Sequence, residues 1–162
     1  MEKTLGKGIL DPEGRLDRNA LRQQVFADDA LRHRVEAALH PLILAALGAE
    51  LAAAQGPYAV AVIPLLAESG ASQALVDRIL VVDSPEDLQI SRLMSRDGGT
   101  SEQARAILSA QASRAARLAI ADDILLNAGD LTAIEAGVDR LDGFYRELAA
   151  RGDLGAPGLR LP

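Results

Sequence analysis

The feature that most constrains the fold is an apolar run of seven residues, Tyr58–Pro64, which reads YAVAVIP and ends at a proline. A short and continuous apolar run is typical of a strand buried on both faces, as in a parallel sheet covered by helices. Ligands of such sheets bind outside the carboxyl ends of the strands. Leu65, Leu66, Ala67 and Glu68 follow the run at once. We therefore expect a functional site near these four residues.

Two further apolar runs predict strands at 79–83 and 123–127, in addition to the strand at 58–64. Helical patterns separate the three runs along the chain. Strands that alternate with helices predict an α/β fold with a parallel sheet.

The pattern along the chain predicts a single α/β domain over residues 1–150. Helices fill residues 17–54, ahead of the first predicted strand, and further helices cover residues 85–119. Residues 151–162 contain three glycines and two prolines, so we expect a flexible tail there.

Capping residues place the helix ends. Asp17 is a predicted N-cap, and Ser84 is another because a proline and two acidic residues follow it. Thr100 and Gln103 have the spacing of a capping box at the start of a helix over 101–119. Pro41 is expected to end or kink its helix, or to begin a new one.

Composition excludes several classes of partner and site. Lysine and arginine total 17 against 23 aspartates and glutamates, and aromatic residues are 2% of the chain. A net charge of −6 with so few aromatics argues against a broad grip on nucleic acid, although a local cationic pocket remains possible. The chain has no cysteine, so disulfides, thiolate zinc sites and cysteine nucleophiles are excluded.

Metal and membrane sites are not expected either. His33 and His40 are the two histidines, and their separation of seven does not suit a shared metal ion. The longest apolar stretch, at 41–54, is interrupted by Gly48 and Glu50. We therefore expect no membrane span and a cytoplasmic location.

Arginines on two predicted helices are the first candidates for chemistry. Arg92 and Arg96 are four residues apart and share one helical face, while Arg114 and Arg117 lie beyond a Gly-Gly break. Two basic helices that meet at such a break could form a lid over phosphates, because a guanidinium group bonds phosphate oxygens in pairs. The alternative is a set of solvated arginines paired with Asp97, Glu102 or Asp122.

Three other polar residues have two interpretations each. His40 could contact an anionic ligand or stabilise a helix end. Glu68 could bond a ligand or orient an arginine, or it could form a salt bridge to Arg92 or Arg96. Asn127 could read a nucleobase edge or cap the turn before Gly129.

Several segments between Ile9 and Ala150, taken in order, resemble the dephospho-coenzyme A kinase family. Ile63–Glu68 is similar to the family's I-P-L-L-x-E, and Gln89–Leu93 with Arg96 matches its Q-x-x-R-L and R-D pattern. The remaining matching segments are Asp17–Arg22 with Val25-Phe26, Leu39–Ile43, Gln111 with Arg114, and Ala121–Asp123 followed by Asn127.

The resemblance implies a P-loop kinase that uses ATP and magnesium to phosphorylate the ribose 3′-hydroxyl of dephospho-coenzyme A. It implies that Arg92 contacts ATP phosphates, that Arg96 and Arg114 assist from a lid, and that Asn127 lies near adenine. The acceptor pocket would be formed by His40, Leu65, Leu66 and Glu68. Dephospho-coenzyme A is the implied small-molecule partner. The resemblance does not determine an oligomeric state.

The chain departs from the family at its start. No G-x-x-x-x-G-K-S/T motif occurs, whereas the family's P-loop kinase fold places that motif after its first strand. We therefore expect a sheet that lacks the family's first two strands, with a gap between the strands at 58–64 and 79–83. The chain alone is then expected to be inactive, and either poorly stable or rearranged. The alternative interpretation is a non-catalytic protein that binds coenzyme A or a nucleotide, or that serves as an interaction protein.

Overall fold

The computed structural model of the chain describes residue 10 and residues 13–162. Its contacts group the chain into two compact units, Met1–Ala53 and Ala54–Pro162. The expectation of one domain over residues 1–150 stays a prediction. Each unit has its own apolar cluster and is described by itself.

The first unit is built from α2 (Arg18–Ala27) and α3 (Asp29–Ala53). The Asp17 carboxylate accepts hydrogen bonds from the first turn of α2, as its N-cap position predicts. Leu31 and Val35 of α3 are buried, and they pack with the partly buried side chains Leu10, Leu21, Val25 and Ala38.

Pro41 lies inside α3, so the helix neither ends there nor begins anew, and two of the three expectations for Pro41 are wrong. A proline removes one backbone hydrogen bond, but alanine and leucine, which favour helices, flank it on both sides. An 18-residue window of this 25-residue helix has a mean hydropathy of 1.5, so the helix is long and apolar enough to cross a membrane by length and composition alone. Sequence analysis did not expect such a segment. The finding is weak evidence, because core helices of soluble proteins pass the same test.

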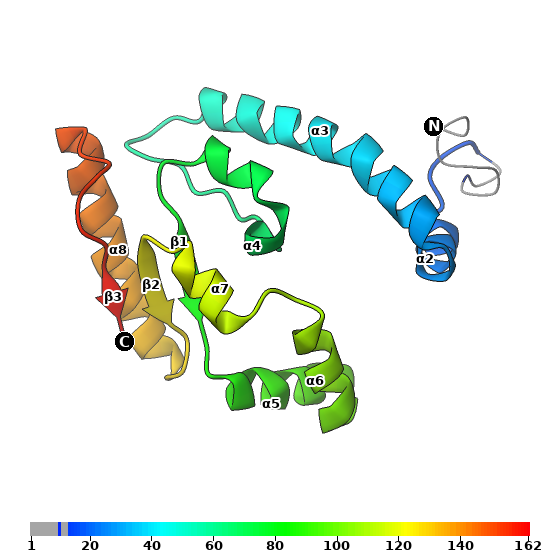
Figure 1. Ribbon diagram of the computed structural model, residues 1–162. Coiled ribbons are helices and arrows are strands. Elements are labelled where there is room, and N and C mark those ends of the chain that lie inside the picture. The colour runs from blue at the N-terminus through cyan, green and yellow to red at the C-terminus, as the bar shows by residue number, and fades with distance from the viewer. Residues whose placement is uncertain (1–9, 11–12) are drawn as a thin grey trace. The chain divides into compact units, whose positions relative to one another are not determined.

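The second unit contains a parallel sheet of three strands in the order β1 (Leu80–Asp83), β2 (Asp123–Leu126) and β3 (Arg160–Leu161) (Figure 1). Leu80 pairs with Asp123, and Ile124 pairs with Arg160. The α/β class and the predicted strands at 79–83 and 123–127 are thereby confirmed.

The predicted strand at 58–64 is wrong for this structure. The segment has no strand partner among the described residues, and Val60 and Val62 are 69% and 89% exposed. An apolar run needs a neighbouring strand to satisfy its backbone groups. Sequence analysis placed a gap between this run and the strand at 79–83, and β1 pairs with β2. Tyr58 anchors the start of the segment, because its hydroxyl donates to Asp142 and its ring meets Tyr145 edge-on.

The C-terminal segment is also different from the expected loose tail. Leu161 of β3 is 4% exposed and packs with Leu125 and Leu141. The Arg78 guanidinium donates to the carbonyls of Leu154 and Ala156, which fixes the chain ahead of β3. Composition suggested flexibility, but these long-range contacts order the segment.

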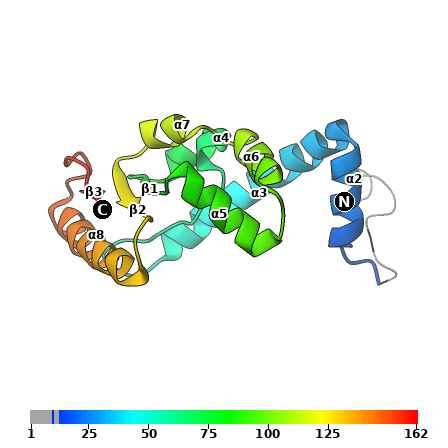
Figure 2. The same cartoon turned by 90° about the horizontal axis from the view of Figure 1, so that it is seen from below.

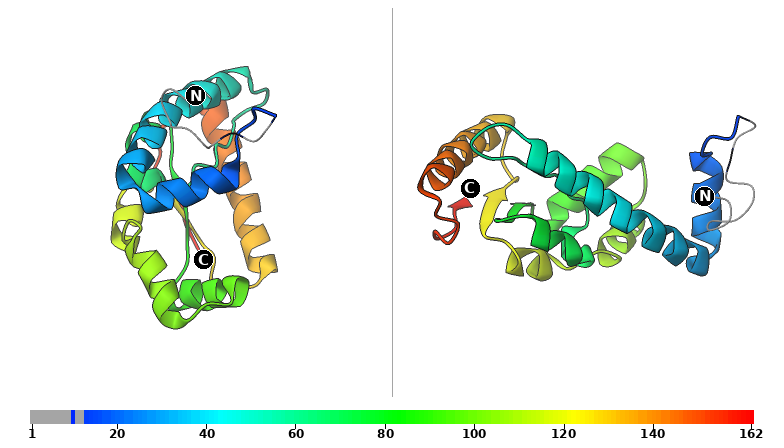
Figure 3. Two further views of the ribbon diagram at one scale, coloured as in Figure 1. Left: turned by 90° about the vertical axis from the view of Figure 1, so that its right-hand side faces the viewer. Right: turned by 90° about the horizontal axis from the view of Figure 1, so that it is seen from above.

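The helices of the second unit are α4 (Leu66–Ser69), the 3₁₀ helix η1 (Ala71–Leu75), α5 (Glu86–Asp97), α6 (Ser101–Ser109), α7 (Arg114–Ala119) and α8 (Leu131–Arg151). Helix α7 packs on β1 and α8 packs on β2, whereas α5 and α6 pack on each other. Figures 2 and 3 show α5 and α6 as a hairpin at the end of the sheet to which β1 leads.

Capping explains the helix boundaries in this unit. Thr100 and Gln103 form the predicted capping box, with bonds of 3.3 and 2.9 Å. The predicted single helix over 101–119 is two helices, because the Ser113 hydroxyl accepts from the Ala116 amide and starts α7 anew. Ser84 is not the cap of α5, because the helix has Pro85 at its N-cap position and no side-chain capping bond, and the Ser84 carbonyl accepts from the Gln89 side chain.

Candidate functional site

The carboxyl ends of β1 and β2 lie at one edge of the sheet. β1 ends at Asp83, and Asn127 directly follows β2. The backbone amide of Asn127 donates to the backbone carbonyl of Asp83 at 2.7 Å, so the two strands end side by side. Such an edge is where parallel sheets bind ligands, and three of the polar residues selected from the sequence, Arg92, Arg114 and Asn127, lie here.

Arg92 and Asn127, two residues selected from the sequence, contact each other at this edge. The Arg92 guanidinium, carried by α5, donates to the side-chain oxygen of Asn127 at 3.0 Å and to its carbonyl at 3.1 Å. A longer contact of 3.4 Å reaches the Ser84 hydroxyl. Arg92 is exposed and has no carboxylate partner among the described residues. Its charge is therefore available to an anion at the edge.

Arg114 lies at the same edge but binds a residue that sequence reasoning missed. Its guanidinium donates to both oxygens of the Asp83 carboxylate, with an Nε–Oδ1 distance of 2.9 Å. The Asp83 side chain is 4% exposed and the Arg114 side chain is 51% exposed. Hydrogen bonds from Arg114 hold the pKa of Asp83 below its ordinary value, although burial acts in the opposite direction. The sequence could have identified Asp83 as a site residue, because it is a carboxylate at the end of a predicted buried strand.

Arg96 fits the alternative interpretation of the arginines. It forms an exposed ion pair with its neighbour Asp97 at 2.6 Å, and such a pair contributes little to stability. Arg117 donates to the Ala112 carbonyl. The four arginines therefore have different partners, and two of them, Arg92 and Arg114, are held by strand-end residues.

The predicted acceptor residues lie in two places. Leu65 adopts the left-handed conformation, with φ of 58°, and starts α4, which contains Leu66 and Glu68. Glu68 does not pair with Arg92 or Arg96 as its alternative predicted; one carboxylate oxygen accepts from the Ala112 amide at 2.7 Å. His40 lies in α3, in the other compact unit.

The described part of the chain, residue 10 and residues 13–162, holds no group of three or more acidic or histidine side chains able to bind a metal ion. The two buried carboxylates have other partners. Asp83 binds Arg114, while Asp123 accepts from Arg78, Tyr145 and the Leu159 amide.

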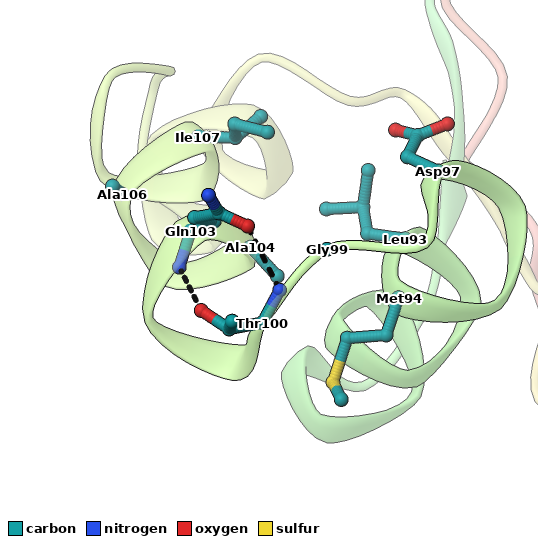
Figure 4. Close-up of a pocket in the computed structure, with 9 residues that line it drawn as sticks. All are labelled: Leu93, Met94, Asp97, Gly99, Thr100, Gln103, Ala104, Ala106 and Ile107. Atoms are coloured by element: carbon teal, nitrogen blue, oxygen red, sulfur yellow. Dashed lines mark hydrogen bonds between the residues drawn. The ribbon is translucent and has the colours of Figure 1, made fainter.

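An apolar crevice of about 410 Å³ lies between α5 and α6 (Figure 4). Leu93, Met94 and Ile107 contribute most of its apolar wall, and the Thr100–Gln103 capping box closes one end. None of the residues predicted for the site lines it. We assign the chemistry to the strand edge instead, because the charged groups are there.

Comparison with known proteins gives one consistent family. A family model described as dephospho-CoA kinase matches residues 1–133. A dephospho-CoA kinase of Thiobacillus denitrificans is 54% identical over 147 residues, which cover 91% of this chain and 73% of the relative. A dephospho-CoA kinase of Methylococcus capsulatus is 49% identical over 148 residues, or 91% and 74% of the two chains.

Solved structures agree with the sequence relatives. A dephospho-CoA kinase from Campylobacter jejuni is similar with a TM-score of 0.67 and 28% identity, covering 90% of this chain and 74% of that one. TT1252 from Thermus thermophilus has a TM-score of 0.70 and 29% identity, covering 88% and 73%.

Proposed function

The chain belongs to the dephospho-CoA kinase family, and from that premise we propose how its residues divide the work of the reaction. The family's enzymes phosphorylate dephospho-CoA with ATP, in the final step of coenzyme A biosynthesis. Phosphoryl transfer depends on positioning and on neutralisation of charge more than on covalent chemistry. The residues to assign are therefore those that hold phosphates and those that hold the acceptor.

Arg92 is assigned to the phosphates of ATP, with Arg96 and Arg114 assisting from the α5–α7 segment. Asn127 is assigned to the neighbourhood of the adenine. The observation that carries this assignment is the contact between Arg92 and Asn127 at the carboxyl edge of the sheet. A guanidinium group already oriented at this edge loses less freedom when it binds an anion.

His40, Leu65, Leu66 and Glu68 are assigned to dephospho-CoA. Leu65 supports the assignment, because it is 55% exposed in a left-handed conformation, and strained residues cluster at binding sites. Glu68 uses only one carboxylate oxygen within the described residues. Its second oxygen therefore remains for a hydroxyl or amine of the acceptor.

Magnesium is proposed to bind together with ATP. No carboxylate cluster among the described residues fits a resident ion, and Mg²⁺ in kinases is bound largely through substrate phosphates. We also place the protein in the cytoplasm, where its small-molecule substrates would be used. No partner beyond ATP and dephospho-CoA is needed for these assignments.

The 162 residues by themselves are proposed to bind the acceptor without turnover. They contain no G-x-x-x-x-G-K-S/T motif, and the lysine and backbone amides of that motif cradle the transferred phosphates in P-loop enzymes. The four residues assigned to the acceptor, in contrast, lie within the chain.

The test uses the purified 162-residue chain. Incubation with ATP, Mg²⁺ and dephospho-CoA should give no coenzyme A above background, whereas calorimetric titration with dephospho-CoA should show binding. His40→Ala should weaken that binding about tenfold, the effect of losing one hydrogen bond to a charged group. His33→Ala changes an exposed histidine of the same helix and should leave the affinity unchanged.

Two results would contradict the proposal. Turnover on the order of 1–100 s⁻¹, which is usual for kinases, would show that the missing motif is not needed. Equal effects of His40→Ala and His33→Ala would remove His40 from the acceptor site.

A further inference from the structure

Ala112 is held from two sides in the connection between α6 and α7. Its amide donates to the Glu68 carboxylate at 2.7 Å, and its carbonyl accepts from the Arg117 guanidinium at 2.6 Å. Glu68 belongs to α4 and is 44 residues away in the chain. The connection is therefore tied to α4 as well as to its own helix.

This connection determines where Arg114 lies. Ser113 caps α7, and Arg114 is the first residue of that helix. Helix α7 packs on β1, whereas α6 packs on α5. Ala112 thus marks the point at which the chain passes from the α5–α6 hairpin to the helix that is fixed on the sheet. A change in the backbone at Ala112 would move the Arg114 side chain relative to Asp83.

Glu68 is itself set in a defined position. Leu65 adopts a left-handed conformation that is unfavourable for a leucine, and the Glu68 amide donates to the Leu65 carbonyl at 3.2 Å. This tight turn brings the Glu68 side chain to the α6–α7 connection. Strain of this kind persists only where surrounding contacts determine the conformation, and the bond to Ala112 is one such contact.

We propose that Glu68 is a positioning residue that fixes the α6–α7 connection, and through it Arg114, relative to segment 65–69. The inference rests on the proposed function in one respect, because that function places the acceptor at segment 65–69 and the phosphates at Arg114. Binding of the acceptor beside Glu68 and ordering of Arg114 are then coupled through one charge-assisted hydrogen bond.

Amide hydrogen exchange on the 162-residue chain tests the bond directly. Glu68→Ala should speed exchange of the Ala112 amide about tenfold or more relative to the wild type, because its acceptor is gone. Glu68→Gln keeps an oxygen at the same position and should stay close to the wild type. The Leu125 amide in β2 reports the overall fold in every variant and should not change.

A matched variant separates this bond from a general loosening of α7. Ser113→Ala removes the cap of α7, so exchange should rise at Ala116 and stay low at Ala112. Wild-type exchange at Ala112 in Glu68→Ala would overturn the proposal, as would equally fast exchange in Glu68→Gln.

Addition of dephospho-CoA tests the coupling. It should slow exchange at Ala112 further in the wild type and in Glu68→Gln, and have no effect there in Glu68→Ala. Binding to the wild type without any change at Ala112 would overturn the coupling. An absence of binding would overturn the proposed acceptor site and the coupling that rests on it, while the Glu68–Ala112 bond would still be decided by the ligand-free exchange rates.

Discussion

Asp123 shows how a single buried charge organises the second unit. Its side chain is 0% exposed and accepts from Arg78, from the Tyr145 hydroxyl and from the Leu159 amide. Burial alone would raise the pKa of Asp123, but these hydrogen bonds outweigh burial and hold it below its ordinary value. Arg78 in turn donates to carbonyls of the segment before β3. Protonation of the Asp123 carboxylate would therefore weaken the contacts that hold both β2 and β3.

The low pKa values of Asp83 and Asp123 predict acid sensitivity. A carboxyl group whose pKa is lower in the folded state stabilises the fold at any pH above its unfolded pKa of about 4, and this contribution is lost as the pH falls through the folded pKa. Urea unfolding between pH 7 and pH 2, followed by tyrosine fluorescence, should therefore show a free energy of unfolding that is level above pH 5 and falls below pH 4.

Asp83→Asn provides the comparison for this pH dependence. With one carboxylate fewer, the fall in stability below pH 4 should be shallower, because fewer protons are taken up on unfolding. Asp139→Asn changes an exposed carboxylate of α8 and should leave the slope as it is in the wild type. A wild-type slope in Asp83→Asn would show that the Arg114–Asp83 pair does not contribute.

Residue types at strand ends were predictable, but their partners were only partly so. The Arg92–Asn127 contact joins two residues that sequence reasoning had already selected. The Arg114–Asp83 and Glu68–Ala112 contacts join residues 31 and 44 positions apart. Neither pair was found, because the expected alternatives favoured other carboxylates and arginines. Sequence spacing carries no information about which loops a fold brings together.

At the scale of elements, α8 and β2 approach each other closely at Gly137. Gly137 is buried in α8, and a methyl group on it would clash with the Leu125 side chain of β2. The contact explains a glycine in the middle of a helix, where it otherwise costs about 1 kcal/mol relative to alanine.

Gly137→Ala should lower the free energy of unfolding by about 1–3 kcal/mol, because overpacking exceeds the gain in helix propensity. Gly143→Ala is the matched control in the same helix, since nothing lies within 4 Å of its added methyl group. That variant should be more stable than the wild type by up to about 1 kcal/mol. Thermal unfolding of the two variants measures the difference, and equal changes would contradict the packing at Gly137.

Capping residues and apolar runs in the sequence located most helices and two strands. The errors in the strands share one cause. Caps at Asp17 and Thr100 are satisfied within one turn, so the sequence could predict them. The apolar run at 58–64 is unpaired, and β3 forms in a segment rich in glycine and proline, because strand pairing depends on neighbours far away in the chain. The break between α6 and α7 at 110–113 was not predicted, because residues that favour helices lie on both sides of it.

At the scale of the whole molecule, the described residues of the two units form separate apolar clusters. Leu31 and Val35 form the centre of the first unit, and Leu125, Leu141 and Leu161 form that of the second. The α/β class followed from the alternation of strands and helices. The division at residue 53 did not, because helix patterns give no indication of which helices share a core.

Separate clusters predict separate unfolding transitions. Both tyrosines of the chain, Tyr58 and Tyr145, lie in the second unit. Tyrosine fluorescence therefore reports that unit alone, while circular dichroism at 222 nm reports the helices of both units.

Leu31→Ala and Leu141→Ala each remove a buried leucine side chain, and such a change costs about 2–5 kcal/mol. Leu141→Ala should move the fluorescence transition to lower urea. Leu31→Ala should leave fluorescence unchanged and shift only the remaining part of the dichroism signal. Coincident shifts of both signals in both variants would show that the two units unfold as one cooperative body.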